Sequence, residues 1–327
     1  MTVKKIMETL SWIISALILY TSGIGIRVIS PIALIIAPVP FFVITKKFGI
    51  KPAFIALALT LPAALYIGDI VGVIIFIFIF SLLGIACSYI SDKAENIIDY
   101  AAKALFLAVI SKVCLLVISV YFFKYNPFII SPEFTETFVK SVAPIISGTG
   151  IKVTPQEMAD YAKSVSDSIL MLMPTMLILF SILDTTLSYY LITYIFRKNT
   201  EIKLPKIPPF GEWKCPQNIF IALIASVVLE LLAKGFPEEK IFAILALNLM
   251  EVTRGIFIIE GLSIMWYFMT KKNIHKIIKL FFVIFALLFP PLSYIMSMLG
   301  IFDIWYDLRR KKSGRNKDES NIDKRRK

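Results

Sequence analysis

Apolar stretches about 20 residues long follow one another along most of the chain, and they restrict its fold more than any other feature. A helix that crosses the hydrocarbon core of a bilayer needs about 20 mostly apolar residues. Expected spans cover 6–26, 28–45, 52–67, 70–90, 98–123, 166–196, 216–234 and 239–270. Hydrophobic residues make up 57% of the chain and charged residues 18%, so lipid must solvate much of its surface. We therefore expect an all-α, polytopic transmembrane helical bundle with eight to ten membrane segments.

The last apolar stretch, 277–308, contains Pro290-Pro291 near its middle. A proline pair cannot continue a helix, because proline lacks the backbone N–H and its ring clashes with the preceding turn. We expect a C-terminal helical hairpin with arms at about 277–289 and 292–307 that turns at the prolines. Each arm would measure at most about 24 Å, so the turn is expected to be re-entrant and buried in protein.

The net charge of +12 is concentrated at the C-terminus, where residues 309–327 contain ten basic and three acidic side chains. This distribution excludes a nucleic-acid-binding protein and predicts a transmembrane domain at 1–308 with a basic, disordered cytoplasmic tail at 309–327. Lysines and arginines next to a membrane segment fix its orientation and attract anionic lipid. Besides the bilayer itself, anionic lipid is the partner that we expect for the tail.

Lysine and arginine also fall at alternate joints between the expected spans, around 46–51, 93–103, 197–214 and 271–279. The positive-inside rule then places both termini in the cytoplasm of a bacterial cell, with the chain crossing the cell membrane repeatedly. The loop at about 124–165 would lie outside. Its Ser131-Pro132 and Thr154-Pro155 pairs predict two short helices. Phe134, Phe138 and Val142 give the first of these an apolar stripe.

Ionisable and amide side chains inside expected spans are the main functional evidence, because a charge in a bilayer is costly and tends to face protein or a cavity. Ser181, Asp184, Thr185 and Ser188 share one face of the sixth span. We hypothesise a polar cavity that binds a small polar solute or relays a proton. The alternative is an interhelical network that only fixes packing. The candidate residues are Lys112, Asp184, Asn248, Glu251, Arg254 and Glu260.

Enzyme signatures are missing from the sequence, which contains no HExxH, nucleophile elbow, Walker loop or GxGxxG motif. Its single histidine, His275, and three scattered cysteines give no metal-ligand spacing. We therefore expect no catalytic activity, no cofactor and no metal.

A proline-rich loop at about 198–215, expected on the cytoplasmic side, ends in Leu-Pro-Lys-Ile-Pro-Pro-Phe-Gly-Glu-Trp-Lys-Cys-Pro at 204–216. Such a segment is stiff and extended, and its tryptophan suits the headgroup region. It would either anchor at the membrane interface or dock a protein partner. The candidate interface residues are Pro208, Pro209, Phe210, Trp213 and Pro216.

Four stretches carry a family resemblance: the loop at 204–216, ALNLMEVTRGIFIIEGL at 246–262, LGIFDIWYDLRR at 299–310, and LMPTMLILFSILDTTLSYYLITYIFRK at 172–198. With these motifs the chain resembles the YybS-like family of predicted polytopic bacterial membrane proteins, a domain of unknown function. The resemblance favours Asn248 and Glu260 as site residues, whereas Glu251 and Arg254 stand where the family is usually apolar. The first half is distantly similar to substrate-binding subunits of energy-coupling-factor transporters, which implies solute binding.

Together these observations predict a transporter-like or solute-binding membrane protein without catalytic activity. The alternative is a structural or regulatory scaffold that binds membrane protein partners through the proline-rich loop and the basic tail.

Overall fold

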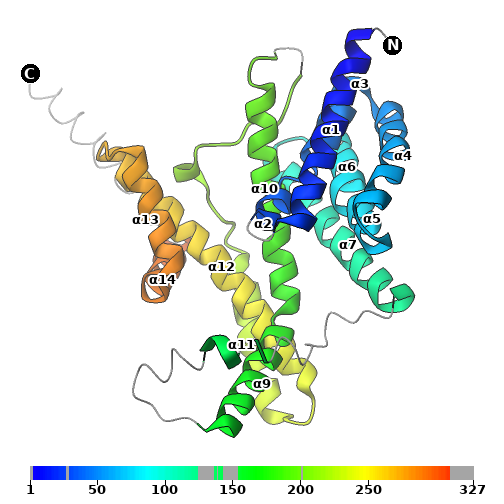
Figure 1. The fold of residues 1–327 in the computed structure, drawn as a ribbon. Coiled ribbons are helices and arrows are strands. Elements are labelled where there is room, and N and C mark those ends of the chain that lie inside the picture. Colours follow the sequence, from blue (N-terminus) through cyan, green and yellow to red (C-terminus); the bar gives the residue numbers. More distant parts are fainter. Residues whose placement is uncertain are drawn as a thin grey trace, which may run out of the picture. The chain divides into compact units, whose positions relative to one another are not determined.

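The computed structural model describes residues 3–26, 29–123, 136–137, 139–142, 154–199 and 202–309. Over these ranges the chain is helical and contains no strand (Figure 1). It divides into two compact units, Met1–Lys206 and Ile207–Lys327, here called the first and second units. The all-α, polytopic helical fold expected from the apolar pattern is confirmed.

The first unit contains most of the helices. They are α1 (Val3–Gly25), α2 (Ser30–Ile35), α3 (Val39–Phe48), α4 (Ile50–Ile67), α5 (Ile70–Ile75), the π-helical η1 (Phe76–Leu82), α6 (Leu83–Lys93), α7 (Ile97–Phe123), α9 (Pro155–Met171) and α10 (Met173–Phe196).

Helix α3 lies at the centre of the first unit, and every residue from Val39 to Thr45 on it is buried. It packs against α1, α4, α6 and α10. Aromatic side chains fill the space around it, since Phe41 and Phe76 are fully buried and their rings meet edge to face at 5.8 Å. Gly84 lets α6 approach closely, because an added Cβ there would lie 3.0 Å from the backbone nitrogen of Phe42.

Seven helices in the described ranges are long and apolar enough to cross a membrane, and the bent α13–α14 pair raises the number to eight if it forms one span. Two expected spans differ in detail. The span expected at 28–45 is broken at Ile36–Pro38, where prolines interrupt the helical hydrogen bonds. The span expected at 166–196 starts at Met173 instead, because α9 ends at Met171 and Pro174 opens a new helix.

Helix α9 begins where the sequence predicted the second short helix of the loop. Thr154 caps it, Pro155 occupies its first position, and the Glu157 carboxylate accepts a hydrogen bond from the Thr154 backbone N–H at 2.8 Å. Ser131, Phe134 and Phe138, which carry the first helix signal, lie outside the described residues.

The second unit consists of the short 3-10 turn η2 (Phe210–Glu212) and the helices α11 (Ile219–Gly235), α12 (Lys240–Lys271), α13 (Lys276–Leu288) and α14 (Pro290–Tyr306). Helix α12 packs against α11 and α14. With 17 residues, α11 is at the short end for a membrane span.

Helices α12 and α14 approach each other closely at two glycines. A Cβ on Gly261 would lie 2.6 Å from the carbonyl carbon of Met296, and one on Gly300 would lie 2.9 Å from that of Phe257. Only hydrogen fits at these positions, so the two backbones touch directly, as small residues allow between membrane helices.

The expected break in the C-terminal stretch is present, and the direction of the chain changes by 105° between α13 and α14 (Figure 1). The prolines do not form the turn itself. Pro290 and Pro291 are the first residues of α14, and Phe289 before them is extended. Proline suits this place, because the N–H groups of a first helical turn have no partner within the helix.

Candidate functional site

The structure places five of the six predicted polar site residues in three separate ion pairs and gives Asn248 a hydrogen bond of its own. Lys112 and Asp184 pair in the first unit. Glu251 and Arg254 pair with each other on α12. Glu260 pairs with Arg309, a partner that the sequence did not suggest. Asn248 is buried on α12, where its amide donates a hydrogen bond to the carbonyl of Ile244 at 2.7 Å.

Lys112 on α7 and Asp184 on α10 form an ion pair inside the first unit. The Lys112 ammonium donates a hydrogen bond to Oδ2 of Asp184. Their side chains are only 13% and 6% exposed. Because each helix is a candidate membrane span, this is a charged pair withdrawn from water within a bilayer-length segment. Intramembrane ionisable groups of this kind mark solute and ion pathways.

A small cavity adjoins Asp184. Its wall includes Thr185 and Ser188 from the same helix, together with Phe42 and Tyr100. Leu83, Cys87, Ile192 and Pro38 complete it. The centre of a water-sized sphere can occupy about 10 Å³ of this space, which is room for one water molecule. The polar face predicted for the sixth span therefore borders a small, partly open space with a mostly apolar lining.

The Glu251–Arg254 pair belongs to the outer surface of α12. The two side chains meet at 2.7 Å and are 26% and 37% exposed. Arg254 also donates a hydrogen bond to the Tyr294 hydroxyl at 3.0 Å. The pair joins two residues one helical turn apart on the same, partly exposed face of α12.

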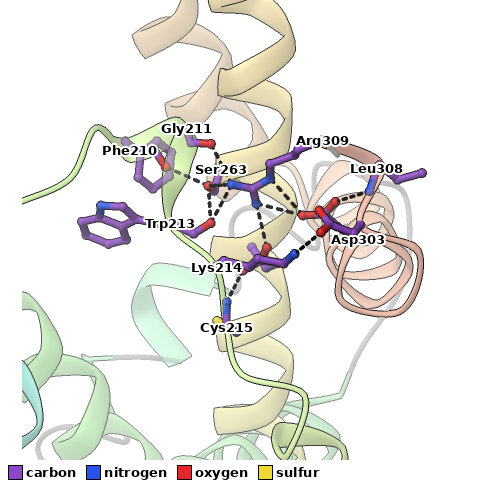
Figure 2. Close-up of polar contacts among 11 residues, drawn as sticks. Phe210, Gly211, Trp213, Lys214, Cys215, Ser263, Asp303, Leu308 and Arg309 are labelled. Atoms are coloured by element: carbon purple, nitrogen blue, oxygen red, sulfur yellow. Dashed lines mark hydrogen bonds and ion pairs between the residues drawn. The ribbon is translucent and has the colours of Figure 1, made fainter. Parts of the chain in front are cut away.

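Arg309 is the centre of a buried polar network in the second unit, which Figure 2 shows. Its guanidinium contacts Glu260 on α12 at 2.7 Å and Asp303 on α14 at 2.9 Å. It also donates hydrogen bonds to the carbonyl oxygens of Gly211 and Trp213, each at 2.7 Å. Since the two carboxylate side chains are at most 1% exposed, these are charge-assisted contacts in a water-poor site.

The segment from Ile207 to Pro216, here called the Pro-rich segment, lies against α12 through this network. The Ser263 hydroxyl on α12 is within hydrogen-bond distance of the Phe210 and Trp213 carbonyls, at 2.7 and 2.9 Å. The Cys215 N–H donates to Glu260 at 2.7 Å (Figure 2). Burial, with a contribution from Glu260, raises the pKa of the Cys215 thiol to about 12. Several parts of one chain thus hold this segment in place.

The predicted interface residues divide by exposure. Pro208, Phe210 and Trp213 are half-buried, and Pro209 and Pro216 are exposed. The Trp213 indole donates a hydrogen bond to the Pro208 carbonyl at 3.1 Å, and its ring meets that of Phe210 edge to face. Anchoring at the headgroup region stays a prediction.

Arg309 and Ser263 were missed by the sequence analysis. Arg309 was expected to begin a disordered tail, but its side chain is 11% exposed and bonded on several sides, so the tail cannot begin there. Asp307, in the left-handed conformation at φ 44°, ends α14. The chain then returns, so that Leu308 N–H and Arg309 both reach Asp303. The position of Arg309 inside the LGIFDIWYDLRR motif was the available signal.

Comparison with known proteins supports the membrane assignment. A family model described as "Predicted membrane protein (DUF2232)" matches residues 12–304. The chain is also 26% identical over 313 residues to "Uncharacterized protein YybS" of Bacillus subtilis (strain 168), covering 94% of this chain and 96% of that protein. No solved structure matches. Because the family model spans most of the chain, including both units, the protein belongs to the DUF2232 family of predicted membrane proteins.

Proposed function

We propose that this membrane protein binds a small polar solute in its first unit, at Lys112 and Asp184, and that it acts in a transporter-like way without catalysing a reaction. The observation that carries the proposal is the buried ion pair beside a cavity. An ion pair is a costly way to hold two membrane helices together, because a well-packed apolar contact would serve equally well. Its position next to a small cavity favours a role in binding.

The second unit supports a different interpretation of its own charges. Around Arg309 the guanidinium N–H groups and the carboxylate oxygens are matched with one another and with backbone groups. A network whose polar groups are already satisfied gives a solute little to bind. We therefore assign the Glu260 contact to holding the Pro-rich segment, and the binding role to the first unit.

We also propose the bacterial cell membrane as its location, with both termini in the cytoplasm. Two ion pairs link segments that the positive-inside rule places on the cytoplasmic side of the membrane. Lys46 pairs with Asp92 from the next such joint, and Lys47 pairs with Glu8 near the start of α1. Labelling of single introduced cysteines in intact cells tests this arrangement. Reaction of a cysteine at position 46 with an impermeant reagent would contradict it.

The binding role is tested by native mass spectrometry of the protein released from lipid. We expect a small molecule bound to the unchanged protein and absent from the double variant Lys112→Met/Asp184→Asn, which removes both charges together. The matched control is Asp99→Asn/Lys103→Met, because that pair lies on the same α7 helix with side chains 26% and 50% exposed. A molecule retained by the first double variant would refute the assignment. Recovery of protein partners alone would favour the scaffold.

A further inference from the structure

Helix α13 in the second unit is apolar on its outer side and carries a charge on its inner side. After its first residue, its only polar side chain is Lys279, which is 8% exposed. In contrast, Phe281, Phe285 and Phe289 are exposed, and their rings stack in a row. A helix on a water-exposed surface has the opposite pattern, with its polar residues outside. The pattern of α13 therefore indicates that acyl chains of lipid cover its outer side.

Helix α13 alone is too short to cross a bilayer. Its 13 residues measure about 20 Å, whereas the hydrocarbon core is about 30 Å thick. Its outer side can therefore contact the acyl chains of only one leaflet. The lysines that precede the apolar residues of α13 place its first turn at the headgroups of that leaflet, because ammonium groups are costly in the hydrocarbon core.

The connection between α12 and α13 gathers positive charge without acidic residues. Lys271, Lys272 and Lys276, here called the basic turn, are all exposed. The sequence contains no aspartate or glutamate from 261 to 302. The ion pairs in the described part of the second unit involve other basic residues. The basic turn therefore has no carboxylate partner among the described residues.

Lys279 is buried without a counter-ion among the described residues. Its ammonium donates a hydrogen bond to Thr270 Oγ1 at 3.0 Å and lies 5.0 Å from the centre of the Trp266 ring. An ammonium group has three N–H donors, and a buried charge is costly unless an opposite charge compensates it. Thr270 directly precedes Lys271, so this ammonium lies next to the basic turn. An anion at this place would compensate all of these charges.

From these observations we propose that Lys279 and the basic turn bind the phosphate of one anionic phospholipid, whose acyl chains cover the outer side of α13. The phosphate supplies the negative charge and the hydrogen-bond acceptors that the lysines lack, and the chains match the row of phenylalanines beside it. This site differs from a general attraction of lipid to basic residues, because the buried Lys279 fixes the position of one phosphate. It is independent of the binding role proposed for Lys112 and Asp184.

The test titrates the purified full-length protein in a neutral detergent with phosphatidylglycerol and follows the midpoint of thermal unfolding. Phosphatidylglycerol should raise the midpoint, because a ligand that binds only the folded state stabilises it. Phosphatidylcholine with the same acyl chains should raise it much less, since its headgroup has no net charge. Equal shifts with the two lipids would refute the role of the lysines.

Two variants separate the buried lysine from the exposed ones. Lys279→Met should raise the midpoint without lipid, because an uncompensated buried charge is gone, and should lose the shift caused by phosphatidylglycerol. Lys272→Gln/Lys276→Gln should keep the lipid-free midpoint and bind the lipid about 25-fold more weakly, which is about fivefold for each lysine near a membrane surface. The matched control is Lys203→Gln/Lys206→Gln, which removes two exposed lysines from another expected cytoplasmic joint and should keep the full shift.

Other results would overturn the proposal. A full phosphatidylglycerol shift in both lysine variants would show that the lipid binds elsewhere. An equal shift with glycerol 3-phosphate, which has no acyl chains, would show that a soluble anion occupies the site. A dimer in native mass spectrometry that Phe285→Gln dissociates would show that a second copy of the chain, and not lipid, covers the outer side of α13. If Lys279→Met does not fold, Lys272→Gln/Lys276→Gln and its control decide the question.

Discussion

Replacing Arg309 with methionine is expected to destabilise the second unit more than the loss of any exposed charge. Methionine has a side chain of similar length that fills much of the space of the arginine stem, so the change removes mainly the guanidinium. In the structure that group contacts Glu260 and Asp303 at 2.7 and 2.9 Å and donates to the Gly211 and Trp213 carbonyls. The variant leaves two buried carboxylates without their cation.

The magnitude follows from that burial. Breaking a buried ion pair by removing one partner costs about 3–5 kcal/mol, because the remaining charge is desolvated and uncompensated. This range includes the cost of losing the hydrogen bond to the Gly211 carbonyl, because contacts within one network do not add independently. The expected loss corresponds to more than about a hundredfold change in the unfolding equilibrium. Arg309→Lys should fall in between, because lysine retains the charge and lacks the planar fork.

The assay is equilibrium unfolding in mixed micelles of increasing dodecyl sulfate content, followed by circular dichroism. Arg254→Met is the matched control, because its side chain is 37% exposed and forms a surface pair with Glu251. The loss of this less buried pair should cost less than the loss of the Arg309 contacts. If Arg309→Met costs no more than Arg254→Met, the network does not stabilise the second unit and the reasoning is wrong.

Three further predictions use other features. Gly261→Ala should cost about 1–3 kcal/mol in the same titration, since the new methyl group meets the α14 backbone, whereas Gly235→Ala, with nothing within 4 Å of an added Cβ, should cost much less. With a pKa of about 12 in place of the ordinary 9.0, the Cys215 thiol should react with iodoacetamide about tenfold faster at pH 10 than at pH 9 in peptide-resolved mass spectrometry, and a rate that levels off between these two pH values would contradict the raised pKa. Hydrogen bonds from the Thr154 backbone N–H and hydroxyl hold the pKa of Glu157 below its usual range. These hydrogen bonds stabilise the start of α9 above the ordinary carboxyl pKa, and the stabilisation is lost as pH falls through the depressed value. Hydrogen exchange of the first-turn amides, corrected for intrinsic rates, should therefore be faster at pH 3 than at pH 6. This difference should disappear when Thr154 is replaced.

The helical architecture was predictable because membrane spans are defined by length and apolarity, which are local properties of a sequence. Capping by Thr154 and the break before Pro290 were equally local. The break at Ile36–Pro38 was missed because Pro38 and Pro40 stand in a stretch as apolar as a continuous span, and only its apolarity was used to predict that span. Hydropathy records how apolar a stretch is and not whether its backbone hydrogen bonds continue.

Partners across the fold were harder to predict, because sequence spacing shows which residues share a helix but not which helices meet. Lys112 and Asp184 are 72 residues apart, and only packing of α7 on α10 brings them together. Arg309 stands at the start of a basic run and resembles the residues after it in charge. What distinguishes it is the return of the chain after Asp307, which depends on a single left-handed residue.

The residues of the Arg309 network are made at different times during synthesis of the chain. Gly211 leaves the ribosome 98 residues before the arginine that binds its carbonyl, an interval of about 5–20 s at the usual rate of bacterial synthesis. During that interval α12 and α14 are made, while the Gly211 carbonyl lacks its permanent donor. These contacts of the second unit therefore form only after Arg309 is made. A nascent chain stalled before Arg309 would contain α11 to α14 and the Ser263 contacts with the Pro-rich segment. It would still lack the guanidinium that contacts α12, α14 and this segment at once.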